Sequence, residues 1–200
     1  MEKELKFGLT AQEYRKLNRL SHSPKTQKNT YFDFQNKLGR GGAGLRLREQ
    51  TGKAPILTLK AEIRQTAKKA KQGWHVRQEW EQSVSPKVAS ALRRGKLPWA
   101  HLDSTVVTRL RALFPKLNLE SLKAIGTLKT RRSILKVGKF KGELDAAQVG
   151  RHRFYELEVE TSASEAARRA VESFFECFEI PLRPRAETKL GALMRLSRKR

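Results

Sequence analysis

The sequence has few cysteines and no long apolar run, and each shortage excludes a class of protein. Among its 200 residues Cys177 is the single cysteine, so an internal disulfide framework is excluded and a reducing compartment is expected. No apolar run approaches the roughly 20 residues of a membrane-spanning helix, and the charged start Glu2-Lys3-Glu4 is unlike a secretory signal. We therefore expect a cytoplasmic protein with no membrane partner.

Acidic residues are scarce relative to basic ones. The chain holds 43 Lys and Arg residues against 20 Asp and Glu residues, which gives a formal net charge of +23. Such a charge favours polyanionic partners, namely nucleic acid, acidic lipid or small phosphorylated molecules, and does not choose among them. The length suits one domain over 1–200, with strand groups at 1–84 and 124–161, a helical insert at 85–123, and C-terminal helices with a basic tail at 162–200.

What the chain does have is a recurring alternation of charged and apolar residues. In the first segment, Glu2, Glu4 and Lys6 share one face of an extended strand, and Leu5 and Phe7 share the other. Taken alone, this row also fits a solvated surface strand. Similar segments, or aromatic ones typical of strands, lie at 30–34, 45–49, 56–60, 76–81, 128–135, 139–145 and 153–160.

Helix start signals separate these segments. They are the capping boxes Thr10/Glu13 and Ser162/Glu165, the pair Ser85-Pro86, and a cap at Asp103 or Ser104. We expect connecting structure at 21–29 and the glycine cluster 39–44, and either a connecting loop or an irregular edge at 61–73. Cys177 is expected in an apolar core, and His22, His75, His101 and His152 at the surface.

The strand pattern predicts an α+β fold with seven or eight strands, each apolar on one face and charged on the other. If the sheet closes with its apolar face outward under helices, the charged face lines a tunnel. Acidic rows from the first and last strands then meet basic rows from the middle strands. This lining suits a metal–triphosphate complex, because carboxylates bind the ion while Arg and Lys neutralise phosphate oxygens.

Five segments resemble, in order and approximate spacing, the motifs of CYTH domains, the triphosphate tunnel metalloenzymes. They are Glu2-x-Glu4-x-Lys6, Tyr31-Phe32-Asp33, Leu45-Arg46-Leu47-Arg48, Leu57-Thr58-Leu59-Lys60 and Glu156-Leu157-Glu158. The resemblance runs from residue 2 to about residue 195 and is strongest to the uncharacterised bacterial branch. It implies a closed eight-stranded antiparallel β-barrel with helices packed on the outside, which binds a triphosphate with Mg²⁺ or Mn²⁺.

The same resemblance implies roles for individual residues. The metal-binding carboxylates would be Glu2, Glu4, Glu79, Glu81, Glu156 and Glu158. The triphosphate-binding residues would be Lys6, Arg46, Arg48, Lys60, Arg77, Arg132 and Lys189, with Arg131 the alternative to Arg132. Lys6 and Glu81 are also the candidates for a direct part in catalysis.

These expectations describe a metal-dependent triphosphatase that uses water as the attacking group. Its substrate would be inorganic triphosphate or a small organic triphosphate, such as thiamine triphosphate or a nucleoside triphosphate. An adenylate cyclase with the same lining is one alternative. A basic module that binds polyphosphate or nucleic acid without catalysis is the other. The protein would be a monomer or a homodimer.

Overall fold

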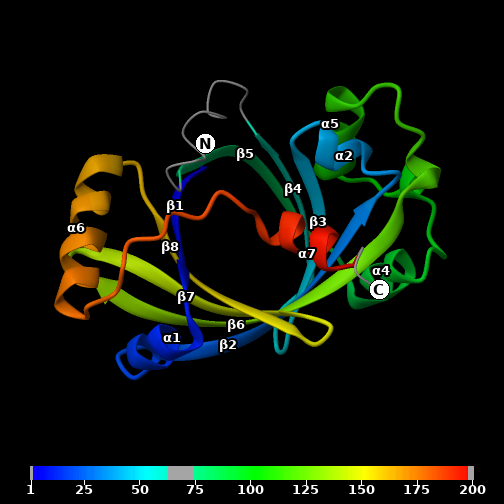
Figure 1. Ribbon diagram of the computed structural model, residues 1–200. Helices are drawn as coiled ribbons and strands as arrows, with labels where there is room; N and C mark the ends of the chain where they lie inside the picture. Colours follow the sequence, from blue (N-terminus) through cyan, green and yellow to red (C-terminus); the bar gives the residue numbers. More distant parts are fainter. Residues whose placement is uncertain (1, 63–73, 198–200) are drawn as a thin grey trace. The chain divides into compact units, whose positions relative to one another are not determined.

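The computed structural model describes residues 2–62 and 74–197, and the side chain of Glu2 lies outside the described part. Its strands are β1 (Glu2–Leu9), β2 (His22–Asp33), β3 (Ala43–Gln50), β4 (Ile56–Glu62), β5 (Trp74–Ser83), β6 (Lys123–Val137), β7 (Phe140–Val149) and β8 (His152–Glu160). They form a closed barrel in the order β1-β5-β4-β3-β2-β6-β7-β8 (Figure 1). The predicted eight-stranded antiparallel barrel is confirmed.

The helices are α1 (Ala11–Asn18), α2 (Lys37–Arg40), α4 (Pro86–Arg93), α5 (Thr105–Leu113), α6 (Ser164–Cys177) and α7 (Lys189–Ser197), with 3₁₀ turns η2 (Trp99–His101) and η3 (Leu119–Ser121). The chain divides into two compact units, which interleave along the sequence. Unit 1 comprises Met1–Thr26, Glu62–Arg77 and Thr130–Thr188, and unit 2 comprises Gln27–Ala61, Gln78–Lys129 and Lys189–Arg200. Each unit has its own hydrophobic core.

The core of unit 1 forms between the apolar faces of β1, β7 and β8 and the helices α1 and α6. Leu5 and Phe7 alternate with the charged residues of β1 and are fully buried. The ring of Phe7 meets that of Phe175 of α6 edge to face, with centroids 5.6 Å apart. Helix α1 starts at the predicted capping box, in which Thr10 and Glu13 each accept a backbone hydrogen bond from the other. The predicted apolar face of these strands is therefore the one that carries helices.

The core of unit 2 forms in the same way between β3, β4 and the helices α2, α4 and α5. Leu45 and Leu47 of β3 pair with Leu59 and Leu57 of β4, and all four are fully buried. Helix α4 begins at Pro86 after the Ser85 cap, and Ser104 caps α5, as the sequence indicated. Each buried leucine contributes about 1.5–3 kcal/mol to folding.

Four local expectations differ from the structure, two of them only in part. Residues 22–29 of the predicted connection 21–29 belong to β2, because backbone pairing with β3 from Gln27 onward needs no apolar side chain. The glycine cluster forms the end of α2, a turn at Gly42 with a φ of 72° and the start of β3. Helix α6 is capped at Ala163, whose N–H donates to Thr161 at 3.0 Å, and not at Ser162. The predicted loop 61–73 begins with the last residues of β4, and 63–73 lie outside the described residues.

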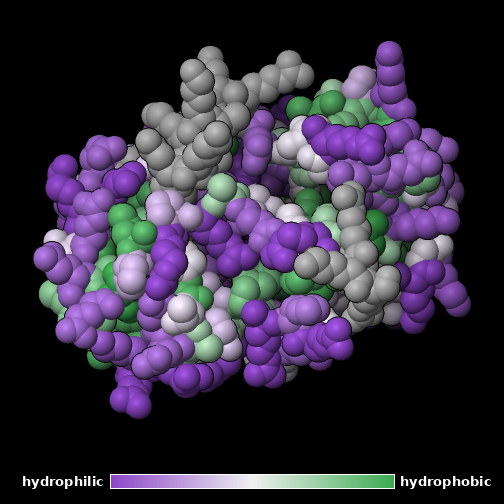
Figure 2. All heavy atoms as spheres, viewed as in Figure 1, coloured by the Kyte–Doolittle hydropathy of each residue, from purple (hydrophilic) through white to green (hydrophobic). Residues whose placement is uncertain are grey.

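Cys177 is exposed, contrary to expectation. Val171 and Phe175 lie four residues apart on the buried stripe of α6, and Cys177 follows two residues later, where the helix has turned away from the core. Figure 2 shows hydrophilic residues over most of the visible face. This agrees with the high content of Lys and Arg, whose charged groups are rarely buried. Within the described residues, no helix is both long and apolar enough to span a membrane.

Candidate functional site

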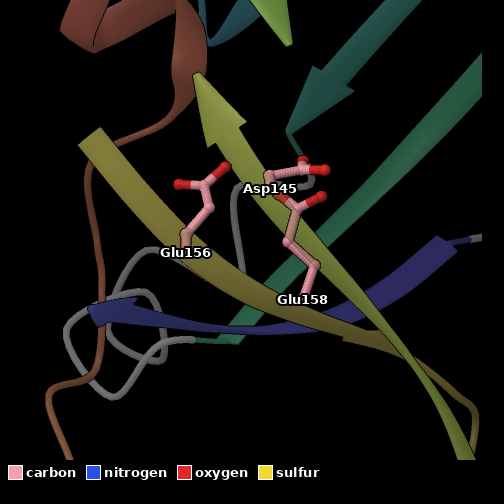
Figure 3. A group of neighbouring side chains, drawn as sticks. All are labelled: Asp145, Glu156 and Glu158. Carbon is pink, nitrogen blue, oxygen red and sulfur yellow. The ribbon is translucent and has the colours of Figure 1, made fainter. Parts of the chain in front are cut away.

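Three buried carboxylates from adjacent strands of unit 1 lie together. Asp145 comes from β7, and Glu156 and Glu158 come from β8, where Asp145 and Glu156 are register partners. Figure 3 shows the three carboxylate groups on the same side of the two strands. One oxygen from each lies within 4.8 Å of the other two, and Asp145 and Glu156 are 0% exposed. We call these three residues the carboxylate cluster.

Lys6 of β1 supplies one of the positive charges that such burial requires. Its ammonium lies 2.6 Å from Glu158 Oε1 and 3.3 Å from Glu4 Oε1. Lys6 is the register partner of Glu158, so the charged face of β1 meets the charged face of β8. All three side chains are buried, and buried charges are tolerated when they are paired in this way.

Arg132 of β6 supplies the second charge. Its guanidinium donates to both Asp145 oxygens, at 2.8 and 2.6 Å, to Glu158 at 2.6 Å, and to Glu143. Burial by itself lowers the pKa of this guanidinium, but Asp145 and Glu158 outweigh it and raise the pKa well above its usual value. Arg132 is thus a permanent cation held by carboxylates, whereas the alternative candidate Arg131 is exposed.

Arg185 supplies the third charge from a segment without regular secondary structure. Its Nε lies 3.3 Å from Glu156 Oε2, and its guanidinium lies 4.4 Å from the centre of the Phe154 ring. The backbone around it is fixed on β1, because Arg185 N donates to Lys6 O and Gly8 N donates to Arg183 O, both at 2.9 Å. The C-terminal segment therefore completes the charge balance of the carboxylate cluster.

His75 and Arg77 of β5 connect to this group through Glu4. Arg77 Nη1 donates to Glu4 Oε1 at 3.1 Å, and Arg77 Nη2 donates to His75 Nδ1 at 2.8 Å. Burial, with a further contribution from Arg77, lowers the pKa of His75 to about 4. The expectation that His75 lies at the surface was wrong, since it is 3% exposed. His22, His101 and His152 are exposed as expected.

A second group of charged residues lies in unit 2, on the face of β3, β4 and β5 opposite the leucines. Lys60 Nζ lies 3.1 Å from Glu79, and Arg46 Nη2 lies 3.8 Å from Glu79 and 3.9 Å from Glu81. Thr58 donates a hydrogen bond of 2.8 Å to Glu81. Five of the predicted site residues, Arg46, Arg48, Lys60, Glu79 and Glu81, thus share one face of one unit.

Burial raises the pKa of Glu81, but the hydrogen bond from Thr58, the interaction with Glu79 and the positive charges of Arg48 and Arg46 lower it by more, so the net shift of this pKa is downward. Among the described residues, the buried Nε and Nη2 atoms of Arg46 have no hydrogen-bond acceptor. A buried donor without an acceptor costs about 1–3 kcal/mol. Arg46 therefore has buried donors that an anionic ligand would satisfy.

The remaining predicted residues are placed as follows. Glu4, Lys6, Arg77, Arg132, Glu156 and Glu158 belong to unit 1, and Lys189 belongs to unit 2, where it begins α7. Arg48 is half-buried on β3. The backbone of Glu2 pairs with that of Arg77, while its side chain falls outside the described part.

Sequence reasoning missed Asp145, His75 and Arg185. Asp145 was the last residue of a predicted strand, although Glu143 and Asp145, two positions apart, repeat the acidic alternation seen in 156–160. His75 lay one residue before the predicted start of its strand. The position of Arg185 depends on backbone pairing of an irregular segment, for which no local pattern exists.

The chain belongs to the CYTH family. The family model described as CYTH domain matches residues 1–190. This match confirms the resemblance drawn from the sequence motifs. A search of curated proteins gave no match.

Solved structures show the same fold. A proposed adenylyl cyclase from Hippeastrum, described as revealing a dominant triphosphatase activity, is 20% identical with a TM-score of 0.81 and covers 98% of this chain and 96% of its own. A proposed adenylate cyclase from Bacillus halodurans is 26% identical with a TM-score of 0.75, covering 95% and 97%. A protein from Pyrococcus horikoshii is 18% identical with a TM-score of 0.58, covering 98% and 99%.

Proposed function

We propose that this protein is a metal-dependent hydrolase of small triphosphates, with inorganic triphosphate as the reference substrate. The observation that carries the proposal is the buried cluster of Asp145, Glu156 and Glu158, whose oxygens lie within 4.8 Å of one another. Three carboxylates buried this closely repel one another and need positive charge beside them, which a divalent ion would supply together with Lys6, Arg132 and Arg185. Membership of the CYTH family and the description of the Hippeastrum protein support the same activity.

The donor set of the carboxylate cluster fits a hard divalent cation. All its ligand atoms are carboxylate oxygens, which Mg²⁺ and Mn²⁺ prefer over nitrogen or sulfur. Asp145, Glu156 and Glu158 would hold the ion, with Glu4 beside them through its contact with Lys6. When bound, the ion supplies charge neutralisation and Lewis acidity for phosphate oxygens.

The chain's own cations bind and orient the substrate in this proposal. Arg46 would offer its buried Nε and Nη2 donors to phosphate oxygens, and Lys60, which lies 3.1 Å from Glu79, would add a second positive charge. Lys6 and Arg132 hold the carboxylates of the metal site in place through their ion pairs with Glu158 and Asp145. The equatorial oxygens of a transferred phosphoryl group carry the charge that such residues stabilise.

An adenylate cyclase is the second candidate, because two of the similar structures carry that description. The two activities differ in the attacking group, which is water in one and the ribose 3′-hydroxyl in the other. A panel of inorganic triphosphate, thiamine triphosphate and ATP with Mg²⁺ or Mn²⁺ separates them by product. We expect phosphate from at least one substrate. Cyclic AMP with pyrophosphate would establish the cyclase instead.

The panel also tests the interpretation that the positive charge serves only to bind polyanions. Binding of RNA or polyphosphate that weakens steeply with salt, needs no divalent ion and is accompanied by no turnover of any substrate would contradict the proposal.

A further inference from the structure

His75 makes a hydrogen bond at each ring nitrogen, and the two bonds lead in different directions. Nδ1 lies 2.8 Å from Arg77 Nη2, and Nε2 lies 3.0 Å from the backbone oxygen of Arg185. The residue is buried in β5 directly opposite Glu4 of β1. It therefore connects the C-terminal segment to the strand that carries Glu4.

The chemistry of its partners fixes the tautomer of the ring. A guanidinium has only donors, so Nδ1 must accept from Arg77. A backbone carbonyl only accepts, so Nε2 must carry the proton and donate a hydrogen bond to the backbone oxygen of Arg185. The ring is thus neutral with its proton on Nε2, in agreement with a pKa lowered to about 4 by burial and by Arg77.

The bond from Arg77 to His75 determines where the rest of the guanidinium points. With Nη2 held by His75, Nη1 reaches Glu4 Oε1 at 3.1 Å. The same Glu4 oxygen lies 3.3 Å from Lys6 Nζ. Glu62 Oε1 lies 3.8 Å from the same Nη2 atom, beyond hydrogen-bond distance, so without the acceptor on His75 the planar group of Arg77 would lose its hydrogen bond at Nη2, and the carboxylate of Glu4 would lose a fixed donor.

We propose that His75 is a positioning residue for the metal site: it orients Arg77, which in turn orients the Glu4 carboxylate toward the cation that the proposed function requires. The inference rests on that function for the identity of the ligand. Groups that orient metal ligands in this way usually matter about 10–100-fold for metal affinity.

Two substitutions separate this role from that of a simple structural tether. The Oδ1 atom of asparagine occupies nearly the place of Nδ1 in histidine, so His75→Asn keeps an acceptor for Arg77 and loses the bond to Arg185. The amide nitrogen of glutamine reaches nearly the place of Nε2, so His75→Gln keeps a donor for the Arg185 carbonyl and loses the acceptor for Arg77. His101→Gln, at an exposed histidine, is the matched control.

The measurement is Mn²⁺ binding to the full chain without substrate, followed by electron paramagnetic resonance of the free ion. We expect His75→Gln to bind Mn²⁺ about 10-fold more weakly, and His75→Asn and His101→Gln to bind it like the wild type. A greater loss in His75→Asn than in His75→Gln, equal affinity in all variants, or no Mn²⁺ binding by the wild type would overturn the inference.

Two controls keep the outcome decisive. Nitrogen-15 NMR of the imidazole in the wild type should show the proton on Nε2, and a proton on Nδ1 would overturn the inference even if neither variant folds. A wild type that binds Mn²⁺ and releases no phosphate from any triphosphate would refute the proposed function. The Mn²⁺ affinities would then still decide the role of His75.

Discussion

Lys6 and Glu158 form a buried ion pair of 2.6 Å between the first and the last strand of the chain. The two residues are register partners in the β1–β8 pairing, and Lys6 also contacts Glu4 at 3.3 Å. One ammonium thus holds together carboxylates from both strands. Because Glu4 and Glu158 share the charge of Lys6, a substitution of either carboxylate also changes the electrostatic environment of the other.

Glu158→Gln should abolish most metal-dependent turnover. The substitution removes a predicted metal ligand and one counter-charge of both Lys6 and Arg132. Phosphate release should fall by about 100-fold or more, the upper end of what loss of an orienting partner alone produces. Glu176→Gln, at an exposed position of α6, should retain full activity. Equal activity of the two variants would show that the metal ligands are misassigned.

Asp145→Asn should weaken metal binding even though the sequence motifs gave Asp145 no role. Its carboxylate belongs to the carboxylate cluster and holds Arg132 through two hydrogen bonds. The amide of asparagine has nearly the same volume as the carboxylate of aspartate but carries no charge. The affinity for Mn²⁺ should therefore drop by about 10-fold or more, which calorimetry measures. An unchanged affinity would exclude Asp145 from the site.

Lys60→Met should impair substrate binding and leave the metal site intact. Lys60 lies in unit 2 on the face that carries Arg46, whereas the carboxylate cluster lies in unit 1. Loss of one charge-assisted hydrogen bond to phosphate corresponds to about a 10-fold rise in KM for inorganic triphosphate. Mn²⁺ affinity should stay at the wild-type value. Lys53→Met, in the exposed turn before β4, is the control; a KM for Lys60→Met equal to that of this control would contradict the assignment.

Glu13→Gln should lower stability at neutral pH and have little effect in acid. Glu13 accepts both guanidinium bonds of Arg183, each 2.8 Å long, and caps α1. The bond from Arg183 lowers the pKa of Glu13 from 4.5 to about 2 in the folded protein. Since the folded pKa is depressed, this stabilisation is complete above pH 4.5 and is lost as the pH falls toward 2.

Because the pair is partly exposed, the expected loss at pH 7 is modest, about 1 kcal/mol. Urea unfolding of the wild type and Glu13→Gln at several pH values measures it. A difference between the two proteins that is as large at pH 2 as at pH 7 would show that ionisation of Glu13 does not contribute.

The strands of the barrel were predictable because their pattern is local. Leu45, Leu47, Leu57 and Leu59 alternate with polar or basic residues, and the period of two assigns each side chain to a face without knowledge of the neighbours. The pairing of β1 with β8 is not local and was not predicted, whereas the family resemblance did place Glu4 and Glu158 in one metal site. The resemblance thus predicted that acidic residues of the first and last strands lie close together, although no local pattern shows which strands pair.

The missed residues depend on the contacts between elements. Asp145 acquires its role through pairing with Glu156 on the next strand. His75 acquires its role because β1 places Glu4 opposite it. Arg185 reaches Glu156 because an irregular segment pairs with β1 through its backbone. No local composition signals such contacts.

The most direct test of the account is phosphate release from inorganic triphosphate by the purified wild-type protein, measured with Mg²⁺, with Mn²⁺ and with excess chelator. The account predicts steady release with at least one of the two ions, none with chelator, and loss of that release in Asp145→Asn. No release with either ion, or release that persists in chelator, would contradict it.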